Sequence, residues 1–361
     1  MKFKAKVSSL KSWLSRATTS ITDAGKQEYK YYFFTVEDNV VFITRTNGNI
    51  FTKIQTKITP EDFPITPFDV GVSSLTQLLD YTDAEDIQFE VEGDIVRVWC
   101  GEYFGRWKSH NLPEGVEIDL PALPTQQPVS LEEYGLFFVN AVNKVRRAAR
   151  DKVTFRNGFC YAGGDLNYQE VETGLPPDFD CDLIPAAYDV VKFLRANPGF
   201  TLAFNESESH LFFYDGGDTY VCPKFDSENY IDWKNDWDKK FAGEKKVKSF
   251  IIETGVLTRA VMRVSLTSDE SSLSIALELG KNVLKISGDD KYGNHGEEAV
   301  EIKLEISDSE LPFKRMVGWD LLMNVLSASD GKAVEMKIGK HFTSIEGETT
   351  KGIFSLRSGY K

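Results

Sequence analysis

The clearest pattern along the chain is an amphipathic helix followed by alternating strands, and it occurs three times. The copies begin at Val70, Leu183 and Val317. Each has apolar residues at helical spacing, then two short stretches in which apolar and polar residues alternate. Helical spacing indicates one buried helix face, and alternation indicates half-buried strands. Because the copies start roughly one domain length apart, the repeat is a whole domain and not a solenoid unit.

The segment in front of each copy has a related pattern. It begins at Phe3, Pro128 and Lys248, and each time predicts a short strand, a helix and then alternating strands with Gly, Asn or Asp at the turns. In the middle segment the helix is expected over 136–151. Each domain is therefore predicted to contain a β-α-β-β-β unit twice. The expected fold class is α+β, with three tandem domains of this kind.

Two stretches interrupt the repeats and predict the domain boundaries. Residues 113–130 contain four prolines, which favour an extended connection, and residues 226–249 are charged and lack periodicity. We therefore expect domains over 1–120, 126–238 and 245–361.

Composition places the chain among ordinary soluble proteins. It has 361 residues, is 41% hydrophobic and carries a net charge of −13. The first residues, MKFKAKVSSLKSWLSR, lack the apolar stretch of a signal peptide, so we expect a cytoplasmic protein. The four cysteines have no C-x-x-C spacing and are expected to be reduced and buried.

The distribution of charge changes this picture, because basic residues gather on the predicted helices. On the helix over 136–151, Phe138, Val142, Val145 and Ala149 share one face, and basic residues occupy the other. Residues 140–152 have a net charge of +4 in an otherwise acidic chain. The candidate nucleic-acid-binding residues are Lys11, Arg16, Lys144, Arg146, Arg147, Arg150, Lys192, Arg195, Arg259 and Arg263.

A single basic helix face is most simply a solvated surface. The recurrence of the same sign in all three repeats favours a surface that faces a polyanion. The contacts would be to phosphates and independent of base sequence, because the chain has no motif that reads bases.

No catalytic constellation is present in the sequence. There is no phosphate-binding loop, no dinucleotide-binding glycine motif and no nucleophile elbow, and the four histidines are scattered. Asp178, Asp180 and Asp182 alternate, as ligands of a divalent metal could, but a proline-bounded turn explains them better. We expect no enzymatic activity, no cofactor and no metal.

The order of these elements resembles the bacterial-type DNA sliding clamp, the β subunit family of DNA polymerase III, over essentially the whole chain. The run DIQFEVEGDIVRVWCGEYFGRWKSHNLP from Asp86 is similar to the end of the family's first domain, and GIFSLRSGYK matches the ending in placement. Residues 162–166 and the last residues depart from the family pattern, and this divergence resembles that of a phage-encoded or otherwise remote member.

The resemblance implies a processivity factor that encircles duplex DNA. Three tandem clamp domains would form half of a ring, with helices inside and sheets outside, and two subunits would close it head to tail as a homodimer. Peptide tails of a replicative DNA polymerase and of a clamp-loader ATPase would bind to it. The rival interpretation is a virion or other structural protein of repeated β-rich domains, which would not explain the basic helices.

The resemblance also implies site residues. Trp107 and Leu266 fall at the subunit interface, although Trp107 is equally expected as a core residue of the first domain. A pocket for partner peptides would involve Tyr161, Gly163, Leu166, Trp233 and Leu356. The alternative for these five residues is ordinary packing where two domains meet.

Overall fold

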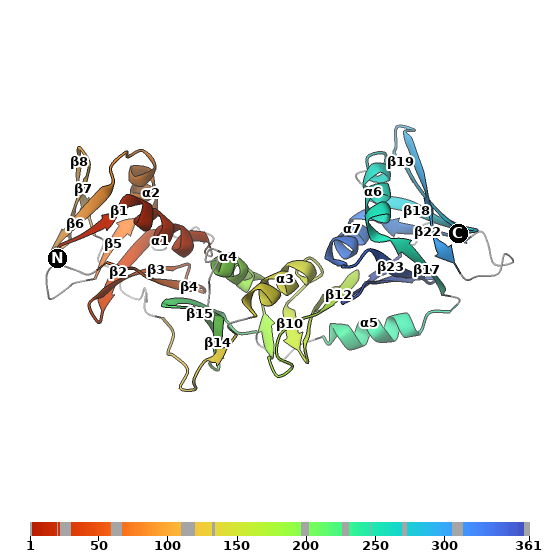
Figure 1. The fold of residues 1–361 in the computed structure, drawn as a ribbon, viewed down its shortest axis with the longest axis horizontal. Helices are drawn as coiled ribbons and strands as arrows, with labels where there is room; N and C mark the ends of the chain where they lie inside the picture. The colour runs from red at the N-terminus through yellow and green to blue at the C-terminus, as the bar shows by residue number, and fades with distance from the viewer. Residues whose placement is uncertain are drawn as a thin grey trace. The chain divides into compact units, whose positions relative to one another are not determined.

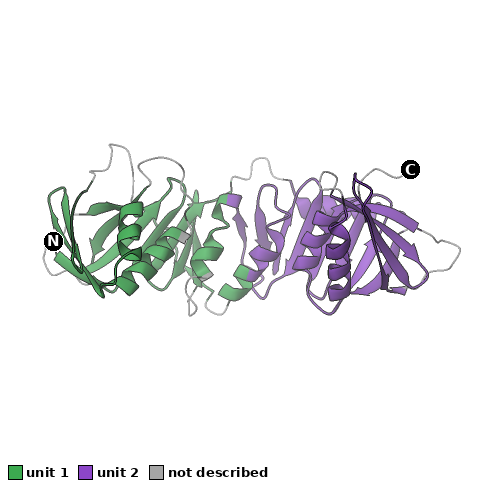
Figure 2. Ribbon diagram, turned by 90° about the horizontal axis from the view of Figure 1, so that it is seen from above, with its two compact units in different colours: residues 1–139, 186–225 green, residues 140–185, 226–361 purple. Residues whose placement is uncertain are grey.

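A computed structural model describes most of the chain as two compact units. It describes residues 2–19, 21, 30–58, 67–109, 120–131, 134–195, 202–225, 231–245, 247–268, 273–304 and 313–356. Unit 1 comprises residues 1–139 and 186–225, and unit 2 comprises residues 140–185 and 226–361. Figure 1 shows the elements and Figure 2 shows the units in separate colours.

The element order contains six copies of strand-helix-strand-strand-strand. The first two copies are β1 (Lys2–Lys6), α1 (Val7–Thr19), β2 (Tyr31–Glu37), β3 (Val40–Thr46), β4 (Phe51–Gln55) and β5 (Phe68–Gly71), α2 (Val72–Asp80), β6 (Asp86–Glu92), β7 (Ile95–Cys100), β8 (Tyr103–Lys108). The next two are β9 (Val129–Ser130), α3 (Gly135–Val145), β10 (Val153–Arg156), β11 (Phe159–Gly163), β12 (Asn167–Glu172) and β13 (Cys181–Leu183), α4 (Val190–Arg195), β14 (Leu202–Glu206), β15 (His210–Asp215), β16 (Asp218–Pro223). A short helix, η2 (Pro185–Ala187), precedes α4.

The last two copies follow an additional helix, α5 (Trp233–Ala242). They are β17 (Lys248–Glu253), α6 (Thr254–Ser265), β18 (Ser274–Gly280), β19 (Val283–Asp289), β20 (His295–Glu301) and β22 (Phe313–Gly318), α7 (Trp319–Ala328), β23 (Ala333–Ile338), β24 (Phe342–Glu346), β25 (Thr350–Ser355). A two-residue strand, β21 (Lys303–Leu304), lies between them. The duplicated unit predicted from the sequence is therefore confirmed.

Consecutive copies exchange their first strands. β1 pairs with β6 of the second copy, and β5 pairs with β2 of the first. The same exchange joins β9 to β14 and β13 to β10, then β17 to β23 and β22 to β18. Each pair of copies is thereby interlocked by two antiparallel ladders.

Unit 1 holds a four-stranded sheet, β1-β6-β7-β8, and an eight-stranded sheet, β5-β2-β3-β4-β16-β15-β14-β9. The eight-stranded sheet is continuous because β4 pairs with β16, where Phe51 is opposite Val221. We call this ladder the unit 1 seam. The helices of unit 1 lie over the near side of its strands in Figure 2, and their buried residues Leu10, Leu14 and Leu75 belong to the core.

Unit 2 holds a nine-stranded sheet, β13-β10-β11-β12-β25-β24-β23-β17-β21, and a four-stranded sheet, β20-β19-β18-β22. The nine-stranded sheet is continuous because β12 pairs with β25 from Asn167 to Val171. We call this ladder the unit 2 seam. Helix α7 packs on one face, where a Cβ on Gly352 would meet Val325, and α5 packs on the other face.

Two sequence-based expectations about local structure were wrong. The helix expected over 136–151 ends at Val145, and residues 146–148 form a turn. The charged stretch 226–249, described as lacking periodicity and predicted as a domain boundary, contains α5 with Trp233 and Trp237 buried. The three-domain division stays a prediction, because each continuous sheet joins strands from two of the expected domains.

Candidate nucleic-acid interface and partner site

The predicted basic residues of unit 1 are mostly paired with carboxylates. The Arg16 guanidinium forms an ion pair with Asp218, whose side chain is 3% exposed. Burial lowers the pKa of Arg16, and the charge of Asp215 opposes this shift. Lys11 lies 3.8 Å from Asp80, and Lys192 lies 2.8 Å from Asp189. The side chain of Arg195 lies outside the described residues.

The same is true of several basic residues of unit 2. The Lys144 ammonium lies 3.6 Å from a carboxylate oxygen of Asp330, and an Arg150 nitrogen lies 2.8 Å from Asp165. Arg263 pairs with Glu298 at 3.1 Å. These pairs reduce the positive field of the helices, because each cation already has a counter-charge within the protein.

Three of the predicted cations remain without an ion pair within the part of the chain that the structure describes. Arg146 and Arg147 are exposed in the turn after α3, and Arg259 is exposed on α6. Arg147 donates a hydrogen bond of 3.5 Å to the Asn324 amide oxygen on α7. These three side chains can reach a phosphate without first breaking an ion pair.

Asp330 is held as a strong acid at one end of the unit 2 seam. Its carboxylate accepts hydrogen bonds from Thr349 N at 3.0 Å and from the hydroxyls of Thr349 and Thr350. Burial by itself would raise the pKa of Asp330, but these hydrogen bonds and the charge of Lys144 outweigh it and lower the pKa to about 2.

The two predicted interface residues lie on different units. Trp107 is half-buried on β8 and lines a cavity of about 780 Å³ with Tyr81 and Tyr103, so it is not a core residue. Leu266 follows α6 and is 84% exposed, and Met262, one helical turn earlier, is 54% exposed. An exposed apolar pair at this spacing is typical of a helix surface that contacts another protein chain.

The structure brings three of the five predicted pocket residues together. Tyr161 and Trp233 lie in one buried cluster, and a Cβ on Gly163 would come within 2.6 Å of the Trp233 Cβ, so glycine permits this packing. Leu166 is exposed, while its carbonyl accepts a hydrogen bond of 2.9 Å from Ser355 N. Leu356 packs instead on the helix-side core of unit 2.

Sequence reasoning missed Trp237, which is fully buried and the anchor of α5. Its indole nitrogen donates a hydrogen bond of 3.0 Å to the carbonyl of Gly164, and its ring meets Phe342 edge-on at 5.5 Å. Trp233, Trp237 and Phe241 are spaced four apart, which predicts one apolar helix face. The surrounding charges concealed this signal.

The alternating aspartates do not form a metal site. Asp180 accepts from Arg156 at 2.9 Å, and Asp182 pairs with buried Lys152 and accepts from Thr154. Within the described ranges, no group of three or more His, Cys, Asp or Glu side chains could hold a metal ion. Over the same ranges, no helix is long and apolar enough to cross a membrane. All four cysteines are buried thiols outside any disulfide, as expected.

Comparisons with known proteins identify the fold. Residues 243–350 match the family described as DNA polymerase III beta subunit, C-terminal domain. A DNA polymerase III subunit beta from Pseudomonas aeruginosa is 14% identical with a TM-score of 0.84, covering 99% of this chain and 100% of that chain. The beta subunit from Thermotoga maritima is 15% identical with a TM-score of 0.81 over the same shares. A sequence comparison with curated proteins finds no match.

One further structure in this group is a Pseudomonas aeruginosa sliding clamp bound to griselimycin, 14% identical with a TM-score of 0.82 and coverage of 99% of this chain and 100% of that chain. The chain therefore has the fold of the bacterial DNA polymerase sliding clamps. The resemblance expected from its repeats is confirmed, at an identity low enough to make it a divergent relative.

Proposed function

We infer that this protein is a DNA sliding clamp, a non-catalytic processivity factor of the cytoplasm that encircles duplex DNA. The observation that carries this function is the sixfold β-α-β-β-β repeat with exchanged first strands, which matches bacterial clamps over 99% of the chain. A virion protein is disfavoured because that resemblance extends over the whole chain.

The repeats also indicate how a ring would close. At both seams the last strand of one copy pairs with the last strand of another, β4 with β16 and β12 with β25. The remaining last strands are β20 and β8, and each forms one edge of a four-stranded sheet. We propose that β20 of one subunit pairs with β8 of a second, which removes two exposed sheet edges and gives a head-to-tail dimer.

Charge on these two edges is complementary. Arg106 and Lys108 lie on one side of β8. Glu301 and Glu297 lie on one side of β20, although Glu297 is already paired with Lys285 at 2.7 Å. The exposed Leu266 of one subunit would then cover the Trp107 cavity of the other. Light scattering should give a mass near twice the 40.7 kDa of the chain. A stable monomer would contradict this closure.

DNA contacts are proposed to be weak and made by helix cations. A ring that holds DNA by topology needs only enough positive charge to offset phosphate repulsion, and salt weakens such contacts. Ion-paired residues such as Lys144 and Arg263 serve less well here than Arg146, Arg147 and Arg259.

The partner site is proposed at the end of the unit 2 seam where Asn167 pairs with Phe354, away from Asp330. Leu166 offers an exposed apolar contact three residues after Gly163, which packs against the buried Trp233. A short extended peptide with one apolar anchor fits a site of this kind, as from a replicative polymerase or a clamp-loader ATPase. Replacing Leu166 by Asp should abolish binding of such a peptide and leave dimer mass unchanged.

The deciding experiment compares circular and linear DNA. After loading by the cognate clamp loader, the protein should remain on a nicked plasmid through gel filtration and leave the same plasmid after linearisation. Blocking both ends of the linear DNA with a bound protein should restore retention. Equal retention on circular and unblocked linear DNA would rule out encirclement.

A further inference from the structure

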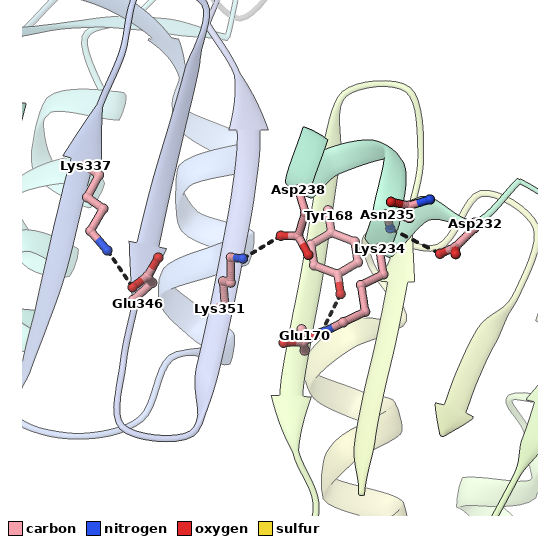
Figure 3. Close-up of polar contacts among 9 residues, drawn as sticks. All are labelled: Tyr168, Glu170, Asp232, Lys234, Asn235, Asp238, Lys337, Glu346 and Lys351. Atoms are coloured by element: carbon pink, nitrogen blue, oxygen red, sulfur yellow. Dashed lines mark hydrogen bonds and ion pairs between the residues drawn. The ribbon is translucent and has the colours of Figure 1, made fainter. Parts of the chain in front are cut away.

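Helix α5 crosses the unit 2 seam on the sheet face opposite α7. It contacts β11 and β12 on one side of the seam and β24 on the other, and Figure 3 shows its polar contacts with β12 and β25. Among the six helix-containing repeats no equivalent of α5 is present in the described residues, because α5 stands before β17 and outside the repeat. Its position therefore needs an explanation of its own.

Two charged residues of α5 face two charged residues of the seam. Lys234 pairs with Glu170 on β12, and Asp238 accepts from the Lys351 ammonium on β25 at 2.6 Å (Figure 3). Lys234 and Asp238 are four apart and share a helix face. Glu170 and Lys351 are direct cross-strand partners in the seam ladder.

The four charges therefore alternate in sign around a four-membered circuit, Lys234, Glu170, Lys351, Asp238, in which two sides are ion pairs and the other two join neighbouring positions in the ladder and on the helix. Glu170 also accepts a hydrogen bond of 2.7 Å from the Tyr168 hydroxyl. The Glu170 side chain is 11% exposed. Charges that are partly withdrawn from water interact more strongly than surface pairs.

Apolar contacts and end contacts fix α5 in the same place. Trp233 and Trp237 are 3% and 0% exposed and cover Tyr168 and Ile353 from the two strands of the seam. Asp232 caps the first turn by accepting from Asn235 N at 3.1 Å. Beyond the last turn, Glu244 accepts from Lys340 N and His341 N at 2.6 and 2.9 Å.

We propose that α5 is a strap that locks the β12–β25 seam, and that the circuit of four alternating charges sets the register in which it locks. The inference goes beyond the proposed clamp function, because it concerns how one sheet of unit 2 is held together and does not require a ring. Its consequence is that residues 140–185 and 247–356 of unit 2 move as one body.

Charge exchange distinguishes a circuit from two independent pairs. The double variant K234E/E170K preserves its own ion pair, but it places a lysine at position 170 opposite Lys351 and a glutamate at position 234 beside Asp238. The quadruple variant K234E/E170K/K351E/D238K restores opposite neighbours at all four positions. A circuit predicts that the double variant is damaged and the quadruple variant recovers, whereas independent pairs predict no damage in either.

Amide hydrogen exchange on the full-length protein is the measurement. We expect the amides of β12 and β25 to exchange about tenfold faster in the double variant and within about threefold of wild type in the quadruple variant. The ladder of β2 and β5 in unit 1 serves as internal reference in each sample. The matched control E206K/K224E, which exchanges an exposed single pair 2.9 Å apart in unit 1, should leave both seams unchanged.

Wild-type exchange at β12 and β25 in the double variant would overturn the circuit. So would a quadruple variant as fast as the double. Loss of protection in both units would also count against the proposal, because the lock is confined to unit 2. None of these outcomes bears on encirclement of DNA, which the plasmid experiment tests separately.

Discussion

The two seams of this chain join equivalent strands by different means. The unit 1 seam is a ladder of three residue pairs supported on its helix side by the ion pair of Arg16 with Asp218. The unit 2 seam is a ladder of five pairs, and an additional helix crosses it on the sheet face opposite α7. The equivalent junction between strands is therefore stabilised by a buried ion pair in unit 1 and by an additional helix in unit 2.

Both seams also take one cation from the first helix of a repeat pair. Arg16 of α1 pairs with Asp218 at the start of β16, and Lys144 of α3 pairs with Asp330 after α7. These cations were expected to face DNA. A basic residue on such a helix can therefore stabilise the sheet junction, and the residue it pairs with shows which role it has.

The largest effect is expected from removing the anchor of the strap. Trp237→Ala deletes a fully buried side chain and its hydrogen bond to Gly164, which should lower the free energy of unfolding of unit 2 by about 3–5 kcal/mol. Denaturant unfolding followed by hydrogen exchange can assign the loss to β12 and β25. The partly exposed Trp99 of unit 1 is the control, and an equal loss in Trp99→Ala would show that α5 has no special role.

The buried ion pair of the unit 1 seam comes next. Arg16→Met leaves the buried carboxylate of Asp218 without the cation that it pairs with, and the expected loss is about 3 kcal/mol. Replacing both partners in R16M/D218N should recover most of this, because the amide oxygen introduced at position 218 can still accept the hydrogen bond from Gln55 N. If the single and double variants unfold alike, the ion pair is not what holds the seam.

The fold could be predicted from the sequence because each copy of the repeat has the apolar spacing of its helix and strands. Apolar spacing at Phe138, Val142 and Val145 marks a helix face wherever the chain lies, and all three are buried. The seams could not be predicted in this way. Phe51 meets Val221 across a long sequence separation, and nothing near Arg16 shows that Asp218 lies beside it.

The candidate site was predicted unevenly for the same reason. Tyr161, Gly163 and Trp233 were grouped by resemblance and do pack together, whereas Leu356 lies in a different cluster. Trp237 was missed although its spacing from Trp233 and Phe241 is helical, because Lys and Asp residues fill the intervening positions. The charges of residues 226–249 indicate a domain boundary, whereas the aromatic residues among them indicate a helix.

The stability of unit 2 should depend on acid pH through Asp330, which lies at one end of the unit 2 seam. The pKa of Asp330 is about 2 in the folded protein and near 3.8 as the ordinary value, so its contribution is present above pH 4 and is lost as the pH falls toward 2. That difference corresponds to about 2 kcal/mol. Unit 2 of Asp330→Asn should therefore be less stable than wild type at pH 6 and lose this difference near pH 2. A constant difference across this range would show that the Asp330 charge is not responsible.

The smallest effects concern DNA binding. They test whether the cations without an ion pair contact DNA while the ion-paired cations stabilise the seams. Arg146→Gln and Arg259→Gln remove charges that have no ion pair among the described residues, so each should weaken association with duplex DNA and reduce the salt slope by about 1. Lys144→Gln removes a charge already compensated by Asp330, so it should alter the stability of unit 2 more than the slope. Salt titrations of binding, with unfolding curves on the same preparations, measure both. If Lys144→Gln changes the slope as much as Arg146→Gln, the ion pair opens on DNA and the seam cation serves both roles.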